Sequence, residues 1–175
     1  VDETQTGRFM LGVGVNSDAG VVGSIVIDEQ NFLATRLPSS WEDVRSGRAF
    51  RGGGQRFRIE LAPGTEVQRY VASFTEPYLF DTLVSFTVSG SYYERYFRDW
   101  REERSSLRTG LGYQLRPNLS VQGLVRVENV VIENPREPTP DDLAEVLGSN
   151  DLIGFKVQAT HDIRDSAFLP SEGHM

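Results

Sequence analysis

The chain has 175 residues, a net charge of −7 at pH 7 and no cysteine. The acidic balance argues against a nucleic-acid partner, which would require a clustered basic surface. Without cysteine there is no disulfide framework, thiolate metal site or thiol nucleophile, and no run of about 18 apolar residues provides a transmembrane helix.

The first predicted element is a β-hairpin near the N-terminus. Residues 8–16 alternate between apolar and small or polar side chains, and residues 21–27 repeat the pattern after a turn-forming cluster. The apolar residues that share one face of the first strand are Phe9, Leu11, Val13 and Val15. Two such segments separated by a short turn predict an antiparallel pair.

Residues 33–53 interrupt the strand pattern and are predicted to form an inserted loop or short helix. Ser40 precedes Trp41 and stands three residues before Asp43, a spacing typical of a helix N-cap. Three consecutive glycines at 52–54 close the segment. They suit either a flexible linker or close backbone packing, and the sequence leaves both open.

Residues 55–81 form the most informative stretch. Strands are predicted over 55–61 and 67–75, joined by a turn. In the first of these strands Phe57, Ile59 and Leu61 alternate with charged residues, which gives one apolar and one charged face. In a soluble sandwich the apolar face would pack in a core. In a membrane barrel it would contact lipid, and the charged face would line a wet lumen.

Four more strands are predicted in the remainder of the chain. They cover 83–93, 106–115, a segment that begins at Leu119, and 152–160. The charged segment 94–104 is predicted to be either a projecting hairpin or a solvated loop. A change of parity near Asn129 predicts a bulge, and residues 141–147 predict a short helix that ends at Gly148.

The strand count and loop pattern favour a membrane barrel. Eight strands of about 9–11 residues have the length that crosses a bilayer at a tilt. Long charged connections are predicted after the fifth and seventh strands, with turns at the opposite end, which is typical of outer-membrane barrels. The insertion at 33–53 departs from that pattern because it lies at the short-turn end.

No catalytic constellation is found in the sequence. Gly12 and Gly14 lack the third glycine and the following helix of a dinucleotide-binding fingerprint, and His161 and His174 do not have the spacing of a zinc site. We therefore expect no enzymatic activity, no cofactor and no metal. Near the C-terminal end, Asp162, Arg164 and Asp165 form either a solvated strand end or a group of ion pairs that fixes strand register.

Several segments match a known family in order along nearly the whole chain. The most specific block contains Gln55, Pro63, Gly64, Phe74, Glu76 and Pro77 within 55–81, and weaker matches lie at 6–9, 31–33 and 162–165. These residues resemble the BamA-like bacterial surface-antigen family of outer-membrane protein assembly factors. Ile163 and the length of the 33–53 insertion depart from the family pattern.

The resemblance implies an all-β, antiparallel, up-and-down transmembrane β-barrel in the bacterial outer membrane. Residues 1–175 would be a partial barrel domain, the first eight strands of about 16, and would follow periplasmic POTRA domains. We expect the chain to be cut from a longer protein, since its N-terminus carries no signal peptide.

In that family the first strand forms a weak seam and templates incoming client strands by β-augmentation. Carried over to this chain, the client-strand edge would consist of Phe9, Leu11, Gly12, Gly14 and Val15. The implied partners are unfolded outer-membrane protein clients, outer-membrane lipid and accessory assembly lipoproteins. A related protein-export pore on the same scaffold is one alternative, and a soluble β-sandwich or lipocalin-like binding module is another.

Overall fold

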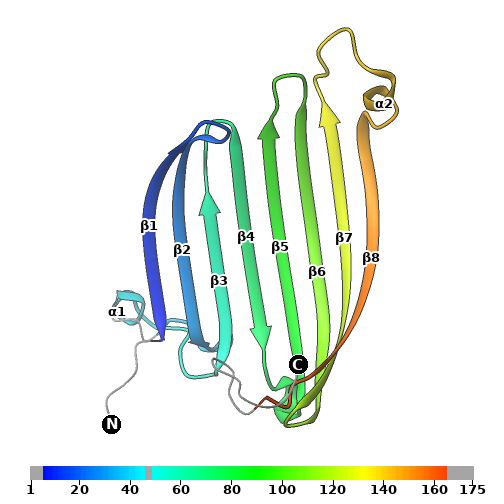
Figure 1. The fold of residues 1–175 in the computed structure, drawn as a ribbon. Helices are drawn as coiled ribbons and strands as arrows, with labels where there is room; N and C mark the ends of the chain where they lie inside the picture. The colour runs from blue at the N-terminus through cyan, green and yellow to red at the C-terminus, as the bar shows by residue number, and fades with distance from the viewer. Residues whose placement is uncertain (1–5, 46–48, 165–175) are drawn as a thin grey trace.

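The computed structural model describes residues 6–45 and 49–164, and it shows eight strands in a single antiparallel sheet (Figure 1). Each strand pairs with its sequence neighbour, so the topology is up-and-down from β1 to β8. The strands are β1 (Gly7–Asn16), β2 (Gly20–Phe32), β3 (Gln55–Ala62), β4 (Val67–Glu76), β5 (Val84–Tyr96), β6 (Arg101–Arg116), β7 (Leu119–Glu133) and β8 (Gly148–His161). The helical elements are α1 (Trp41–Arg45), the 3₁₀ turn η1 (Leu79–Asp81) and α2 (Asp141–Ala144).

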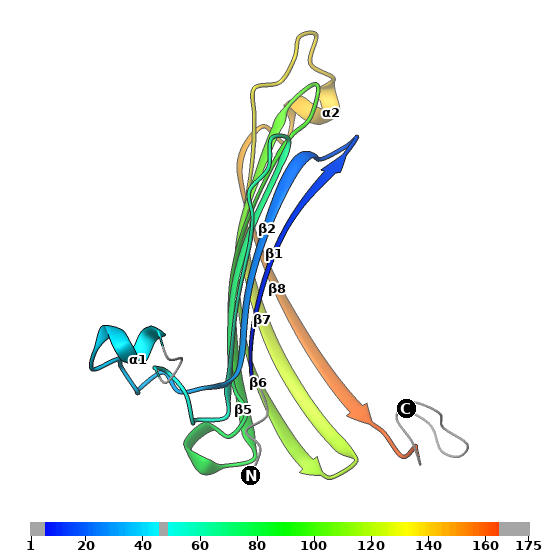
Figure 2. The same ribbon diagram turned by 90° about the vertical axis from the view of Figure 1, so that its left-hand side faces the viewer.

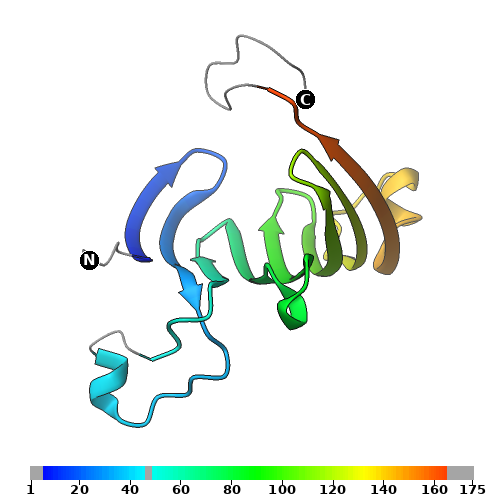
Figure 3. The same cartoon turned by 90° about the horizontal axis from the view of Figure 1, so that it is seen from below.

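The sheet is curved into an open trough, with β1 and β8 at its two rims (Figure 3). The expected all-β, up-and-down fold is confirmed, and the eight strands do not close into a barrel. Within the described residues no second layer packs on the sheet, and Val26 is the only buried apolar residue. The β-sandwich alternative is therefore wrong, because it requires a core between two sheets.

Strand register divides the sheet into an apolar and a polar face. Residues directly opposite each other on antiparallel neighbours point to the same side. One row across all eight strands is Phe9, Ile27, Ile59, Ala72, Gly90, Leu107, Val127 and Ile153. The adjacent row, on the opposite face, is Arg8, Asp28, Arg58, Ser73, Ser89, Arg108, Arg126 and Gly154.

The polar face is the concave one. Along β6, Leu107 and Leu111 are exposed, whereas Glu102 and Gly110 on the opposite face are buried. Curvature crowds side chains on the inside of a trough and separates those on the outside, which accounts for this difference. We call the face with the row from Phe9 to Ile153 the convex face and the other the concave face.

The charged segment 94–104 is a hairpin that continues the sheet. β5 runs to Tyr96 and β6 starts at Arg101, so the connection is short. Ion pairs hold this extension: Arg101 lies 2.6 Å from both Glu94 and Glu103. The prediction of a long loop after the fifth strand is therefore wrong, because paired charges sustain the strands beyond the apolar band.

Other predicted boundaries also need correction. The bulge near Asn129 is wrong, since β7 keeps continuous register with β6 and β8 through that residue. The register shifts occur instead between Glu29 and Phe32 of β2, and between Gln114 and Arg116 of β6. The helix predicted over 141–147 is confined to α2, and Gly148 starts β8.

The insertion between β2 and β3 lies outside the trough, on its convex side (Figures 2 and 3). Its helix α1 begins after Ser40, whose Oγ accepts a hydrogen bond from the Asp43 backbone N–H at 3.3 Å, as the N-cap prediction required. A Cβ at Gly53 would lie 2.7 Å from the Phe32 carbonyl oxygen, so this glycine has a packing role rather than a linker role.

Candidate functional site

The β1 edge is the part of the sheet that the sequence singled out for client binding. β1 pairs with β2 on one side, and its other side has no partner strand among the described residues. Phe9, Leu11 and Val15 point from the convex face and are 68%, 72% and 80% exposed. A strand edge of this kind presents unpaired backbone N–H and C=O groups to any chain that approaches it.

Two glycines lie on the concave side of that edge strand. A Cβ built at Gly14 would meet nothing within 4 Å, and one at Gly12 would meet Ser24 Cβ at 3.8 Å. Packing within the described residues therefore does not require glycine at either position. Glycine in a strand increases backbone freedom, so these residues weaken the edge without relieving a clash.

The family-motif residues hold the β3–β4 hairpin at both ends. At one end, Gln55 Nε2 donates to Glu76 Oε2 at 2.6 Å, and Gln55 Oε1 accepts from the Ala34 backbone N–H at 2.8 Å. The other Glu76 oxygen accepts from the Tyr78 N–H at 3.1 Å, directly after Pro77. This network ties the insertion, β3 and the β4–β5 turn together.

At the opposite end the motif joins the first two hairpins. The Pro63 carbonyl oxygen accepts from the Gly23 N–H at 2.7 Å. A Cβ at Gly64 would lie only 2.3 Å from the Val67 carbonyl oxygen and 3.1 Å from that of Val21. The turn between β3 and β4 can therefore approach β2 only because residue 64 has no side chain.

Phe74 completes the motif on the convex face. It stands opposite Phe57 in the β3–β4 register, and its ring meets that of Phe32 edge-on at 6.3 Å. Phe32 also stacks on Phe57 at 4.8 Å and on Phe50 of the insertion at 5.5 Å. This aromatic cluster fixes the insertion against the sheet, so the motif as a whole has a structural role.

Asp162 and Arg164, two of the residues predicted to form either a solvated strand end or register-fixing ion pairs, pair with each other just beyond β8. Arg164 Nε and Nη2 donate to the two carboxylate oxygens of Asp162 at 2.9 and 2.7 Å. These hydrogen bonds lower the pKa of Asp162 from 3.8 to about 2. The Asp162 N–H also donates to the Asn118 carbonyl at 2.9 Å, which ties the end of β8 to the β6–β7 turn. Asp165 lies outside the described residues.

Comparison with known proteins identifies the family. The family model of the Omp85 superfamily domain matches residues 49–175. The chain belongs to the Omp85 superfamily. Proteins of this superfamily reside in the bacterial outer membrane, as the resemblance implied, and they assemble or transport proteins there. No curated protein matches the sequence.

Among solved structures, this chain is similar to BamA from Haemophilus ducreyi lacking POTRA domains 1–3. The TM-score is 0.54 at 16% sequence identity, and the match covers 98% of this chain and 32% of that one. This likeness shows a shared fold and confirms the BamA-like interpretation of the strand pattern. The chain spans about a third of the length of that relative.

Sequence reasoning missed an ion-pair cluster on the convex face of the Omp85 sheet. Arg101 pairs with Glu94 and Glu103, and its guanidinium lies 5.4 Å from the Tyr96 ring centroid. Tyr92 donates to Glu103 at 3.2 Å. The cluster lies beyond the last apolar row and marks the end of the apolar band. Only the register of β5 with β6 brings these residues together, so the sequence alone could not identify it.

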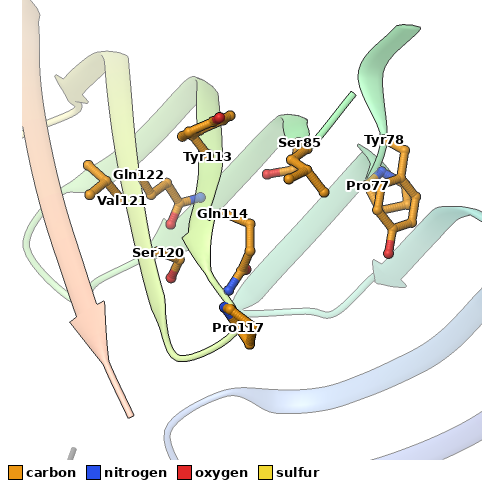
Figure 4. A pocket seen from close by; sticks show the side chains of 11 residues that line it. Pro77, Tyr78, Ser85, Tyr113, Gln114, Pro117, Ser120, Val121 and Gln122 are labelled. Carbon is orange, nitrogen blue, oxygen red and sulfur yellow. The ribbon is translucent and has the colours of Figure 1, made fainter. Parts of the chain in front are cut away.

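A hollow of about 580 Å³ lies at the turn end of the Omp85 sheet (Figure 4). Its lining has hydroxyl and amide groups, including those of Ser85, Gln114, Ser120 and Gln122, and no charged side chain. These groups can form hydrogen bonds with a ligand or water. No helix among the described residues is long and apolar enough to cross a membrane.

Proposed function

We propose that the chain is the N-terminal half of the barrel of an outer-membrane protein assembly and insertion factor. In this proposal β1 presents its free edge as a template for strands of unfolded outer-membrane protein clients. The single observation that carries the proposal is the β1 edge, which has no partner strand among residues 6–45 and 49–164, on a sheet with an apolar convex face. Membership in the Omp85 superfamily supports it.

The convex face suits outer-membrane lipid as a partner. It is apolar from Phe9 on one rim to Ile153 and Phe155 on the other, and both rims remain exposed. In water such a surface would promote aggregation, whereas hydrocarbon solvates it. The aromatic side chains of Trp41 and Phe80, at the turn end of the sheet, are 80% and 89% exposed and suit the membrane interface.

The mechanism needs neither cofactor nor covalent chemistry. A client strand that adds to β1 gains main-chain hydrogen bonds, and its alternate side chains continue the apolar and polar faces. Gly12 and Gly14 let the edge deform while a client enters and leaves. Accessory lipoproteins would act from the periplasmic side.

Disulfide trapping tests the template role directly, because the chain contains no cysteine. The variant Gly12→Cys, in the whole protein, is expected to form a disulfide with a cysteine in the terminal strand of a stalled client. A cysteine at a neighbouring β1 position should form its disulfide with a different residue of the client strand, since side chains of paired strands alternate between the two faces. The matched control is Gly123→Cys in β7, which also has space for a side chain but has partners on both edges.

Two results would contradict the template role. One is an absence of hybrids at every β1 register, and the other is equal trapping at Gly123. A second candidate function, protein export through the lumen, is favoured by the polar concave face. An export substrate would form disulfides with concave residues such as Ser89 but not with the β1 edge.

A further inference from the structure

The concave face is basic although the chain is acidic. Strand register places nine basic residues on it: Arg8, Arg56, Arg58, Arg69, Arg95, Arg104, Arg108, Arg126 and Lys156. Only four acidic residues share that face in the described strands: Asp28, Glu60, Glu102 and Glu128. The net charge of −7 is therefore carried elsewhere, and the concave face has an excess of positive charge.

Part of this excess is concentrated on β6 to β8, although Arg8, Arg56 and Arg95 on the same face also have no carboxylate within 4 Å among the described residues. Arg108 stands directly opposite Arg126 in the β6–β7 register, an arrangement of like charges that destabilises a sheet. Arg126 is paired with Glu128. Among the described residues, neither Arg108 nor Lys156 has a carboxylate within 4 Å.

The same cations line one hollow of about 490 Å³. Arg108, Arg126 and Lys156 border it together with the hydroxyl-bearing residues Thr87 and Ser89, and no carboxylate does. The charged groups and hydroxyls can all donate hydrogen bonds to an anion. Leu124, Val125, Gly154 and Phe155 complete the lining, so the hollow combines donors for an anion with an apolar wall.

The spacing of the cations favours an extended polypeptide as the occupant. Arg126 stands opposite Gly154, and Lys156 follows two residues later on β8. This separates the two cations by one period-two step, about 6.8 Å along the strands. An extended segment parallel to the strands repeats its same-side carboxylates at that interval. We propose that the concave face of β6–β8 binds an extended acidic polypeptide segment with carboxylates on alternate residues.

This inference rests on the proposed function insofar as the concave face must line a water-filled lumen. Its test is a binding measurement on the whole protein in detergent micelles. A fluorescent peptide of alternating glutamate and threonine, ten residues long, is titrated and followed by anisotropy. Saturable binding is expected, with weaker binding by the block peptide of five glutamates and five threonines and none by the lysine–threonine peptide.

The variant Arg108→Gln/Lys156→Gln should weaken binding by about tenfold, since each partly exposed charge contributes modestly. Arg8→Gln/Arg69→Gln removes the same charge from the same face away from the hollow and should change affinity less than about twofold. Arg108→Lys/Lys156→Arg keeps the charges and should keep binding. Retention of the heat-dependent gel shift of a folded barrel checks that each variant folds.

Three outcomes overturn the inference: no saturable binding, equal losses in the two glutamine variants, or no preference for alternating over block glutamates. If inorganic phosphate displaces the bound peptide at a concentration lower than that of the peptide, the hollow binds a small anion instead. Client assembly in proteoliposomes is measured separately. Normal assembly without peptide binding would refute only this inference, whereas failed β1 trapping with intact binding would refute only the template role.

Discussion

Replacement of Gly64 by alanine should destabilise the folded protein through one steric contact. The added Cβ would lie 2.3 Å from the Val67 carbonyl oxygen, about 1 Å inside the shortest ordinary contact of 3.4 Å. Both the Val67 and the Val21 carbonyls are backbone atoms, so the neighbours cannot move aside by a rotamer change. Overpacking of this kind typically costs about 1–3 kcal/mol, and we expect Gly64→Ala to fall in that range.

The matched control is the same substitution at Gly123, where a Cβ meets nothing within 4 Å. Gly123→Ala should change the free energy of unfolding by less than about 0.5 kcal/mol. The assay is reversible urea unfolding of the lipid-embedded protein, followed by the fluorescence of its two tryptophans. Equal stability of the two variants would refute the argument that the turn after Pro63 needs close backbone approach.

Three further predictions test the motif, the ion pair and the faces. Glu76→Ala removes acceptors for Gln55 and the Tyr78 N–H, so urea unfolding should show a loss of about 1–3 kcal/mol, and no loss would contradict the network. The pKa of Asp162 is lowered from 3.8 to about 2, so its stabilisation should be complete above about pH 4 and be lost as the pH falls through about 2. The difference in urea midpoint between the parent protein and Asp162→Asn should shrink over that range, and a constant difference would contradict the ion pair. Phe155→Arg on the convex face should cost about 2–4 kcal/mol in a bilayer, whereas Gln158→Arg on the concave face should be nearly neutral; equal costs would argue against the assignment of the faces.

The strand centres could be predicted from the sequence because the two faces of the sheet meet different surroundings. In the band from Val84 to Tyr92 the convex residues are apolar and the concave ones small or polar, so alternation is clear. Beyond that band both faces carry charges. The alternation signal then disappears, and cross-strand pairs such as Arg101 with Glu94 determine where the strands end.

The parity change near Asn129 shows the same limit. Apolar residues move to the concave side at Val130, and the sequence pattern alone predicts a bulge there. The register is nevertheless continuous, because β7 leaves the apolar band and its outward residue becomes polar. A change in the surrounding solvent and a change in the backbone produce the same sequence pattern.

The candidate site divides in a similar way. The β1 edge could be predicted because it depends only on strand order and on local alternation. The opposition of Arg108 and Arg126 could not be predicted, since it depends on which residues of two strands face each other. Parity assigns each arginine to a face of the sheet. The register, which turn length and bulges set, decides whether that arginine lies opposite a carboxylate or another arginine.

The distribution of charge also affects which chains can approach the open edges of the sheet. Both rims are open strands with apolar convex residues, exemplified by Val15 on β1 and Val157 on β8. Such edges pair readily with any extended chain. A basic concave face favours approach of acidic segments and repels basic ones, so electrostatics can select among chains before backbone pairing begins. If both proposals hold, the edge would supply binding energy common to all clients, and the concave charges would supply the discrimination.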